Sequence, residues 1–100
     1  MIPIYDRKDF RREILKTLDT LRFCEFRIQA VLKALRASGF EAVTSGDLLN
    51  EVRYLEKKGL LNIKKSINPV TEEEFMELSI NEKGVDLLEG NCSDVGVSCG

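Results

Sequence analysis

Residues 45–60, SGDLLNEVRYLEKKGL, carry polar and basic side chains at the spacing of one helix face. At about 100° per residue, one narrow stripe of this helix holds Gly46, Asn50, Arg53 and Lys57, with Tyr54 at its edge. The acidic residues Asp47, Glu51 and Glu56 lie to the sides, so no carboxylate stands at the centre of the stripe. Amide, guanidinium and ammonium groups donate hydrogen bonds. The stripe is therefore suited to contact an anionic surface.

A second interpretation of this stripe needs no ligand. Arg53 and Lys57 can form the solvated side of an ordinary helix, in which Arg53 pairs with Glu56 at i+3. Tyr54 can equally lean on a neighbouring helix. The sequence leaves both interpretations open.

The sequence lacks histidine and the motifs that are typical of enzymes and metal sites. The chain has no histidine, the commonest general base and metal ligand. Cys24, Cys92 and Cys99 include no CxxC pair, so we expect reduced thiols rather than a disulfide framework or a four-ligand zinc site. Neither a Gly-rich phosphate loop nor a nucleophile–base spacing is present. We therefore expect no enzyme, no catalytic or metal-binding residues and no cofactor, although Cys92 and Cys99 can join a metal site that a partner supplies in part.

The length and composition favour one small domain with unevenly distributed charge. The 100 residues are 43% hydrophobic, which is enough for a single core. The net charge is -2, yet residues 1–67 carry 14 basic and 9 acidic side chains, whereas residues 68–100 carry Lys83 against 8 acidic ones. This asymmetry can place opposite charges on different faces, or it can reflect a solvated acidic tail.

Three amphipathic helices are predicted to position the polar stripe. In residues 6–21 apolar side chains recur at intervals of three and four, with Asp6 as a candidate N-cap. Residues 27–39 repeat the pattern and end at a glycine. The third helix is the one that bears the stripe, and Thr44 or Ser45 can cap its start.

A hairpin and a short helix are predicted after the third helix. From Leu61 the period changes to two, and a second alternating run begins at Met76, with the turn residues SINPVTEEE between the runs. Residues 81–90 form the last helix, with Asn81 as a candidate cap and Gly90 as the stop. A lone hairpin is only marginally stable in water, so its apolar face must pack on the helices. The predicted shared core comprises Leu48, Val52, Leu55, Leu61, Ile63, Met76 and Leu78.

This order of elements resembles the winged helix-turn-helix domain, an α+β fold with a three-helix core, a two-stranded β-hairpin wing and a short C-terminal helix. Leu55, Gly59 and Leu60 in VRYLEKKGLL stand where that family places the L..LE..GL pattern that ends its recognition helix. The stretch LSINEKGVDLL is similar to the family's LT..G pattern in the second wing strand and closing helix.

A narrower resemblance concerns LKALRASGFEAVTSGDLLNEVRYLEKKGLL, which is similar to small winged-helix proteins of comparable length encoded in Mu-like prophages. The chain departs from tight helix-turn-helix units in its five-residue link GFEAV, where the motif's turn usually has about three or four residues. The winged-helix resemblance covers residues 6–90. It implies a domain over residues 1–90 and leaves residues 91–100 as a flexible tail.

The resemblance implies that the third helix enters the major groove of double-stranded DNA and that the hairpin beside it reaches the backbone. Asn50 and Arg53 would then contact base edges, because an amide matches adenine and a guanidinium can grip guanine through two bonds. Lys57 and Tyr54 would bind phosphate, and Ser45 at the helix N-terminus would offer a further donor.

The wing residues Lys64 and Lys65 complete the expected nucleic-acid-binding set. Successive strand residues point to opposite faces, so we expect only one of the two lysines to reach the same DNA. A lysine pair before a turn is equally an ordinary protection of an exposed strand edge. The acidic residues 72–74 near the wing tip would repel phosphates.

Two functions remain open. We expect a small phage or bacterial transcriptional regulator that binds double-stranded DNA as a homodimer. The alternative is a winged-helix module that binds a protein partner. The net negative charge and the acidic wing tip favour it, because DNA affinity rises with the number of phosphates that basic side chains neutralise. We expect a cytoplasmic protein with no membrane partner, since no apolar run approaches about 18 residues and MIPIYDRKDFRR lacks a signal peptide's apolar centre.

Overall fold

The apolar residues of the first half of the chain form three helices. The structure is a computed structural model that describes residues 7–20, 25–90, 92 and 96–97. The helices are α1 (Arg7–Asp19), α2 (Ile28–Ala37) and α3 (Ser45–Lys57), which confirms the three predicted helices. Phe10, Ile14 and Leu18 turn one face of α1 fully into the core, as their spacing predicts. The proposed cap Asp6 lies outside the described residues.

Several contacts hold the link between α2 and α3 in place. Gly39 has a φ of 112°, a conformation that glycine adopts easily and that ends α2. Phe40 then packs its ring against that of Phe10, with the ring centroids 5.1 Å apart. Arg36 donates two hydrogen bonds to the carbonyl oxygen of Val43, at 2.8 and 3.0 Å. The link is longer than a tight helix-turn-helix turn, and these contacts hold it in one shape.

Thr44 caps the start of α3. Its hydroxyl oxygen accepts the backbone N–H of Asp47 at 3.2 Å, while Oδ2 of Asp47 accepts the backbone N–H of Thr44 at 3.0 Å. This capping box satisfies two donors that the helix itself leaves without partners. Of the two candidate caps, Thr44 fills the role and Ser45 is the first residue of the helix.

The predicted hairpin forms, but it belongs to a three-stranded antiparallel sheet. Its strands are β2 (Leu61–Ile67) and β3 (Glu74–Ile80), with Leu61 opposite Ile80 and Ile67 opposite Glu74. The short strand β1 (Phe26–Arg27) pairs with the other edge of β3, giving the order β1-β3-β2. The sequence prediction of two strands was incomplete here, because two residues are too few to show an alternating pattern.

The last helix, α4 (Glu82–Leu88), starts and ends where the sequence predicts. The side chain of Asn81 accepts the backbone N–H of Gly84 at 2.9 Å, and Gly90 ends the element with a φ of 84°. Gly84 packs closely against Leu60 and Ile80. A Cβ at this position would stand 2.7 Å from Cγ1 of Ile80 and would also meet the carbonyl oxygen of Leu60. The glycine of the LSINEKG stretch is therefore required for α4 to pack beside the sheet.

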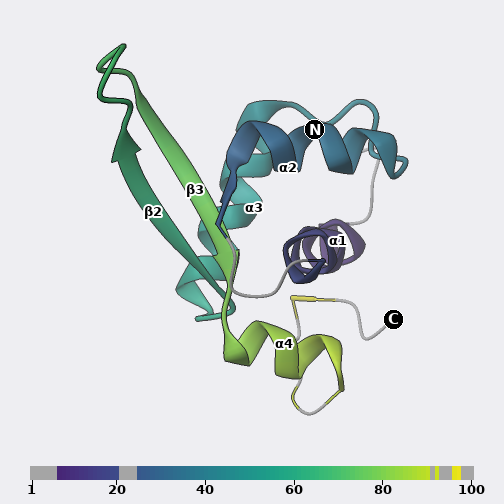
Figure 1. The fold of residues 1–100 in the computed structure, drawn as a ribbon. Helices are drawn as coiled ribbons and strands as arrows, with labels where there is room; N and C mark the ends of the chain where they lie inside the picture. Colours follow the sequence, from purple (N-terminus) through teal and green to yellow (C-terminus); the bar gives the residue numbers. More distant parts are fainter. Residues whose placement is uncertain (1–6, 21–24, 91, 93–95, 98–100) are drawn as a thin grey trace.

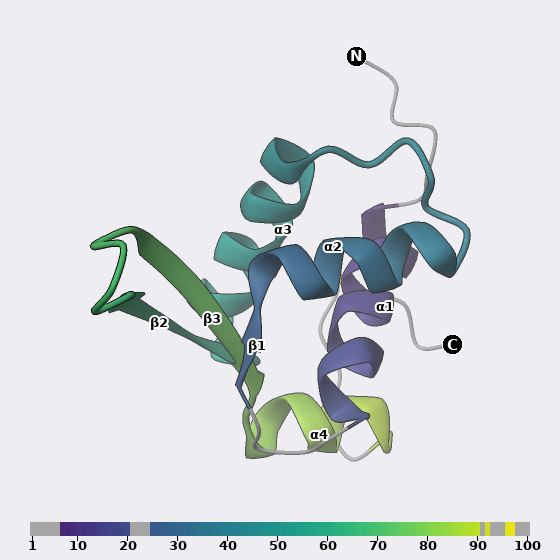
Figure 2. The ribbon, with the colours of Figure 1, turned by 45° about the horizontal axis from the view of Figure 1, so that its top comes forward.

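The elements form a mixed α+β arrangement that, over the described residues, has four helices and three strands. Figure 1 shows α1 between α2 and α4, with the far half of the hairpin projecting away from the helices. Figure 2 shows β1 beside β3 at the start of α2. Of the predicted core, Leu48, Val52, Leu55, Leu61 and Leu78 are buried, while Ile63 and Met76 are partly buried at its margin. These two lie where the hairpin leaves the helices.

Candidate nucleic-acid interface

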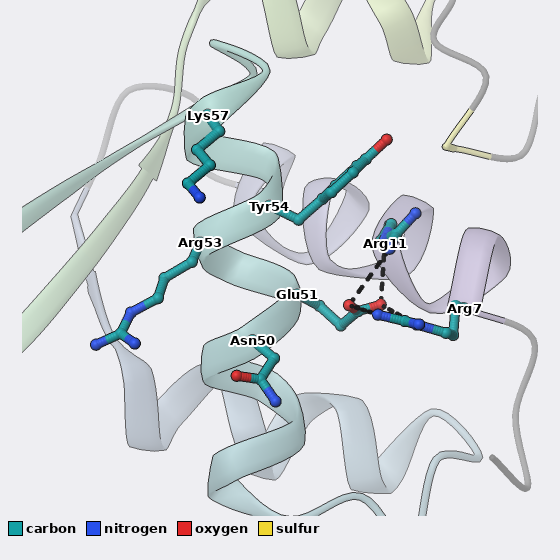
Figure 3. A pocket seen from close by; sticks show the side chains of 7 residues that line it. All are labelled: Arg7, Arg11, Asn50, Glu51, Arg53, Tyr54 and Lys57. Atoms are coloured by element: carbon teal, nitrogen blue, oxygen red, sulfur yellow. Dashed lines mark hydrogen bonds and ion pairs between the residues drawn. The ribbon is translucent and has the colours of Figure 1, made fainter. Parts of the chain in front are cut away.

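One face of α3 is exposed to solvent along its length. Asn50, Arg53 and Lys57 lie on this face, opposite the buried Leu48 and Val52. Figure 3 shows Arg53 and Lys57 projecting from one side of the helix, with Asn50 toward its start. The helical period thus places these three residues on one surface.

The three side chains are available for a ligand. Among the described residues, Asn50, Arg53 and Lys57 form no hydrogen bond or ion pair, and the Arg53–Glu56 pair of the second interpretation is not present. Two unpaired cations and an amide on a helix face match the donors that nucleic acids accept. The same groups also suit any other anionic surface.

The sequence places Glu51 at the side of the stripe but does not predict its burial. Its side chain is only 2% exposed and reaches α1. Its carboxylate lies 3.1 Å from Nη2 of Arg7 and 3.1 Å from Nε of Arg11. One signal was present: Glu51 follows Leu48 by three residues and precedes Leu55 by four, so it borders the apolar face.

Arg11 connects three parts of the chain. Besides Glu51, it donates from Nη1 to the carbonyl oxygen of Gly96 at 2.9 Å. Its guanidinium carbon also lies 3.7 Å from the ring centroid of Tyr54, a cation–π contact. Tyr54 is half-buried and leans on α1, as one of its two sequence interpretations predicted (Figure 3). A Cβ at Gly96 would stand 2.9 Å from Nη1 of Arg11, so the glycine permits this close approach.

These side chains surround a shallow cavity of about 320 Å³ between the two helices, which we call the α1–α3 cavity. It is lined by Arg7, Arg11, Asn50, Glu51, Arg53, Tyr54 and Lys57. The lining holds four basic side chains and one carboxylate. A protein with a net negative charge therefore has a distinctly positive surface here.

The remaining predicted site residues, Ser45, Lys64 and Lys65, are not among the residues that line this cavity. Ser45 is exposed at the start of α3. The strand β2 directs Lys64 and Lys65 to opposite faces of the sheet, as its alternation predicts. Lys64 lies 3.6 Å from a carboxylate oxygen of Glu25, on the face away from the core. Lys65 shares the face of Leu61, which packs toward the helices.

Two further findings limit the site chemistry. In the part of the chain that the structure describes, no three His, Cys, Asp or Glu side chains are grouped so that they could hold a metal ion. In the same part, no helix combines the length and the hydropathy needed to cross a bilayer.

Comparison with known proteins identifies the fold but no family. No family profile matches the chain, and no curated protein matches its sequence. Among solved structures, the chain is similar to that of a proposed transcriptional regulator from Thermoplasma acidophilum, with a TM-score of 0.70 and 16% sequence identity. The match covers 82% of this chain and 75% of that one. At this identity the likeness establishes a shared fold, while function depends on the site.

Proposed function

We propose that this protein is a winged-helix transcriptional regulator that binds double-stranded DNA through the exposed face of α3. In this proposal α3 is the recognition helix and the β2–β3 hairpin is the wing. The observation that carries it is the set of Asn50, Arg53 and Lys57, exposed and without partners among the described residues. The likeness to a proposed regulator supports the fold on which the proposal rests.

The side chains of α3 divide into base-reading and phosphate-binding roles. The guanidinium of Arg53 can bind O6 and N7 of guanine, and the amide of Asn50 can bind N6 and N7 of adenine. Lys57 and Ser45 bind backbone phosphates. Tyr54 contributes at the edge of the surface, because its ring stays against Arg11.

The active species in this proposal is a homodimer. One domain of this size reads a short site, and two copies related by a twofold axis read half-sites about 34–36 Å apart. Light scattering of the DNA complex should give two protein chains per duplex. One chain per duplex would contradict the dimer and leave the α3 interface standing.

The experiment for the proposed function begins with selection of a binding site from random duplex DNA. Affinities are then measured for the selected duplex and a scrambled one. Replacing Arg53 or Asn50 by Ala should weaken binding to the selected duplex by about 1–3 kcal/mol and reduce discrimination against the scrambled duplex. Lys57→Ala should lower the affinity for the selected and the scrambled duplex by the same factor.

The control variant is Lys16→Ala, which removes a basic charge from α1 at a site outside the α1–α3 cavity. Its affinity for both duplexes should equal that of the wild type. If no duplex is enriched, or if the Asn50, Arg53 and Lys57 variants all bind DNA like the wild type, the proposed function is wrong.

A second candidate function is binding of a protein partner through the wing. Val70 and Ile67 near the wing tip are 88% and 61% exposed, and the acidic residues 72–74 stand beside them. Exposed apolar side chains with a surrounding charge are typical of protein contacts. Capture of a protein partner that Val70→Ser abolishes, without DNA binding, would favour this candidate. The kinship with prophage proteins remains a prediction from the sequence resemblance.

A further inference from the structure

The α1–α3 cavity brings a second helix to the surface that we propose for DNA. Arg7, the first residue of α1, lines the cavity together with Asn50, Arg53 and Lys57 of α3. Its side chain is 59% exposed, although its guanidinium lies 3.1 Å from the carboxylate of Glu51. Arg7 is thus held in place and still accessible from solvent.

The buried carboxylate of Glu51 contacts two guanidinium groups with different exposure. The Arg11 side chain is 11% exposed and also donates to the carbonyl oxygen of Gly96. Its contacts therefore lie inside the protein. The two guanidinium groups thus share one carboxylate, and of the two the Arg7 side chain is the more exposed. Arg7 also lines the cavity, and Figure 3 shows it reaching toward Glu51.

The position of Glu51 also has an electrostatic consequence for α3. A carboxylate between Asn50 and Arg53 in the sequence would repel DNA if it pointed to solvent. Buried against two arginines, it instead fixes the guanidinium of Arg7 beside the exposed face of α3. A side chain fixed in this way has little freedom to follow base edges, whereas a backbone phosphate recurs at every nucleotide.

We propose that the α1–α3 cavity receives a phosphate group of the DNA backbone, which Arg7 binds and which Glu51 orients as a positioning residue. A guanidinium donates paired hydrogen bonds to phosphate oxygens, and Lys57, which lines the same cavity, supplies a further donor. This inference rests on the proposed function. It adds α1 to the two DNA-contacting elements, α3 and the wing.

The test compares Arg7→Gln with Lys16→Gln. Both variants remove one positive charge from α1, but the two residues are nine positions apart and so lie on opposite sides of the helix. Affinity is measured for the selected and scrambled duplexes over a series of NaCl concentrations. Arg7→Gln should reduce the slope of log K against log [NaCl] by about one. It should lower the affinity for the two duplexes by the same factor. Lys16→Gln should leave the slope and the affinity unchanged.

Two more variants separate positioning from charge. Arg7→Lys keeps the charge and should retain the wild-type salt slope while losing part of the affinity, because an ammonium cannot donate in a fork. Glu51→Gln makes the protein more positive. It should nevertheless weaken DNA binding, because the guanidinium of Arg7 loses its charged anchor. Tighter binding by Glu51→Gln would contradict the positioning role.

The outcomes distinguish this inference from the proposed function. If the wild type binds DNA and Arg7→Gln has the same salt slope, the phosphate role of Arg7 is overturned while the α3 interface stands. If the wild type binds no duplex, both proposals fail. Inorganic phosphate titrated into DNA-free protein provides a further arm. If it saturates the cavity and Arg7→Gln abolishes this without changing the DNA slope, the cavity binds a free anion instead.

Discussion

Glu51 places a carboxylate inside the protein between two arginines, with oxygens 3.1 Å from both guanidinium groups. Removing a carboxylate from water is costly, and hydrogen-bonded opposite charges must offset that cost. All buried side-chain polar atoms of the described residues have hydrogen-bond partners, so none of them adds the cost of an unsatisfied group. The arrangement joins α3 to α1 more specifically than apolar contacts alone.

Replacing Glu51 by Ala should lower the free energy of unfolding by about 3–5 kcal/mol, since it leaves the buried guanidinium of Arg11 without its charge partner. Urea denaturation measures the change. The control is Glu56→Ala, an exposed carboxylate on the same helix, which should stay within about 0.5 kcal/mol of the wild type. Equal stability of the two variants would mean that the Glu51 contacts contribute nothing.

Among the elements, α4 depends on the absence of a side chain at one position. Gly84 lies in its first turn, with the carbonyl oxygen of Leu60 and the side chain of Ile80 in direct contact. Leu60 follows the C-terminal end of α3, and Ile80 ends β3, so this point joins α3, the sheet and α4. An added methyl group must displace backbone atoms.

Gly84→Ala should therefore destabilise the protein by about 1–3 kcal/mol, even though alanine is the better helix former. Gly46→Ala provides a matched substitution near the start of α3. Its Cβ would meet only Oγ1 of Thr44, at 3.8 Å, so it should raise stability by about 0.5–1 kcal/mol. Thermal unfolding compares the two. A higher melting temperature for Gly84→Ala than for the wild type would show that α4 can shift to accommodate the methyl group without loss of stability.

The helices and the hairpin could be predicted from the sequence because each repeats a period several times. The exposure of Asn50, Arg53 and Lys57 follows from the same period. Two other features have no periodic signal. Strand β1 is two residues long, and the contact of Glu51 with Arg7 joins residues 44 positions apart. A helical period gives the direction of a side chain, whereas its burial depends on which element packs beside it.

At the scale of the whole molecule, charge is separated rather than balanced. The net charge is -2, yet the α1–α3 cavity is lined by four basic side chains and one carboxylate. Residues 68–100 carry 8 acidic side chains against one lysine, and three of these acidic residues, 72–74, lie at the turn of the β2–β3 hairpin. Such a separation directs an anionic partner to one face and repels it from another.

The C-terminal residues contribute to the same region. Gly96 and Val97 are buried, and the carbonyl oxygen of Gly96 accepts a hydrogen bond from Arg11. The domain boundary at residue 90 and the flexibility of residues 91–100 remain predictions. A truncation after residue 90 measured by urea denaturation would test both, since loss of stability requires that the segment packs in solution.

The central claim is that the exposed face of α3 contacts DNA, and amide chemical-shift mapping by NMR tests it most directly. The selected duplex is titrated into ¹⁵N-labelled protein, and the shift of each amide is followed. The largest changes should occur at Asn50, Arg53 and Lys57 of α3, with smaller ones at Lys65 of β2. Lys64 should change little, because it lies on the other face of the sheet beside Glu25. Changes confined to α4 or to the Lys64 face, with α3 unaffected, would contradict the account.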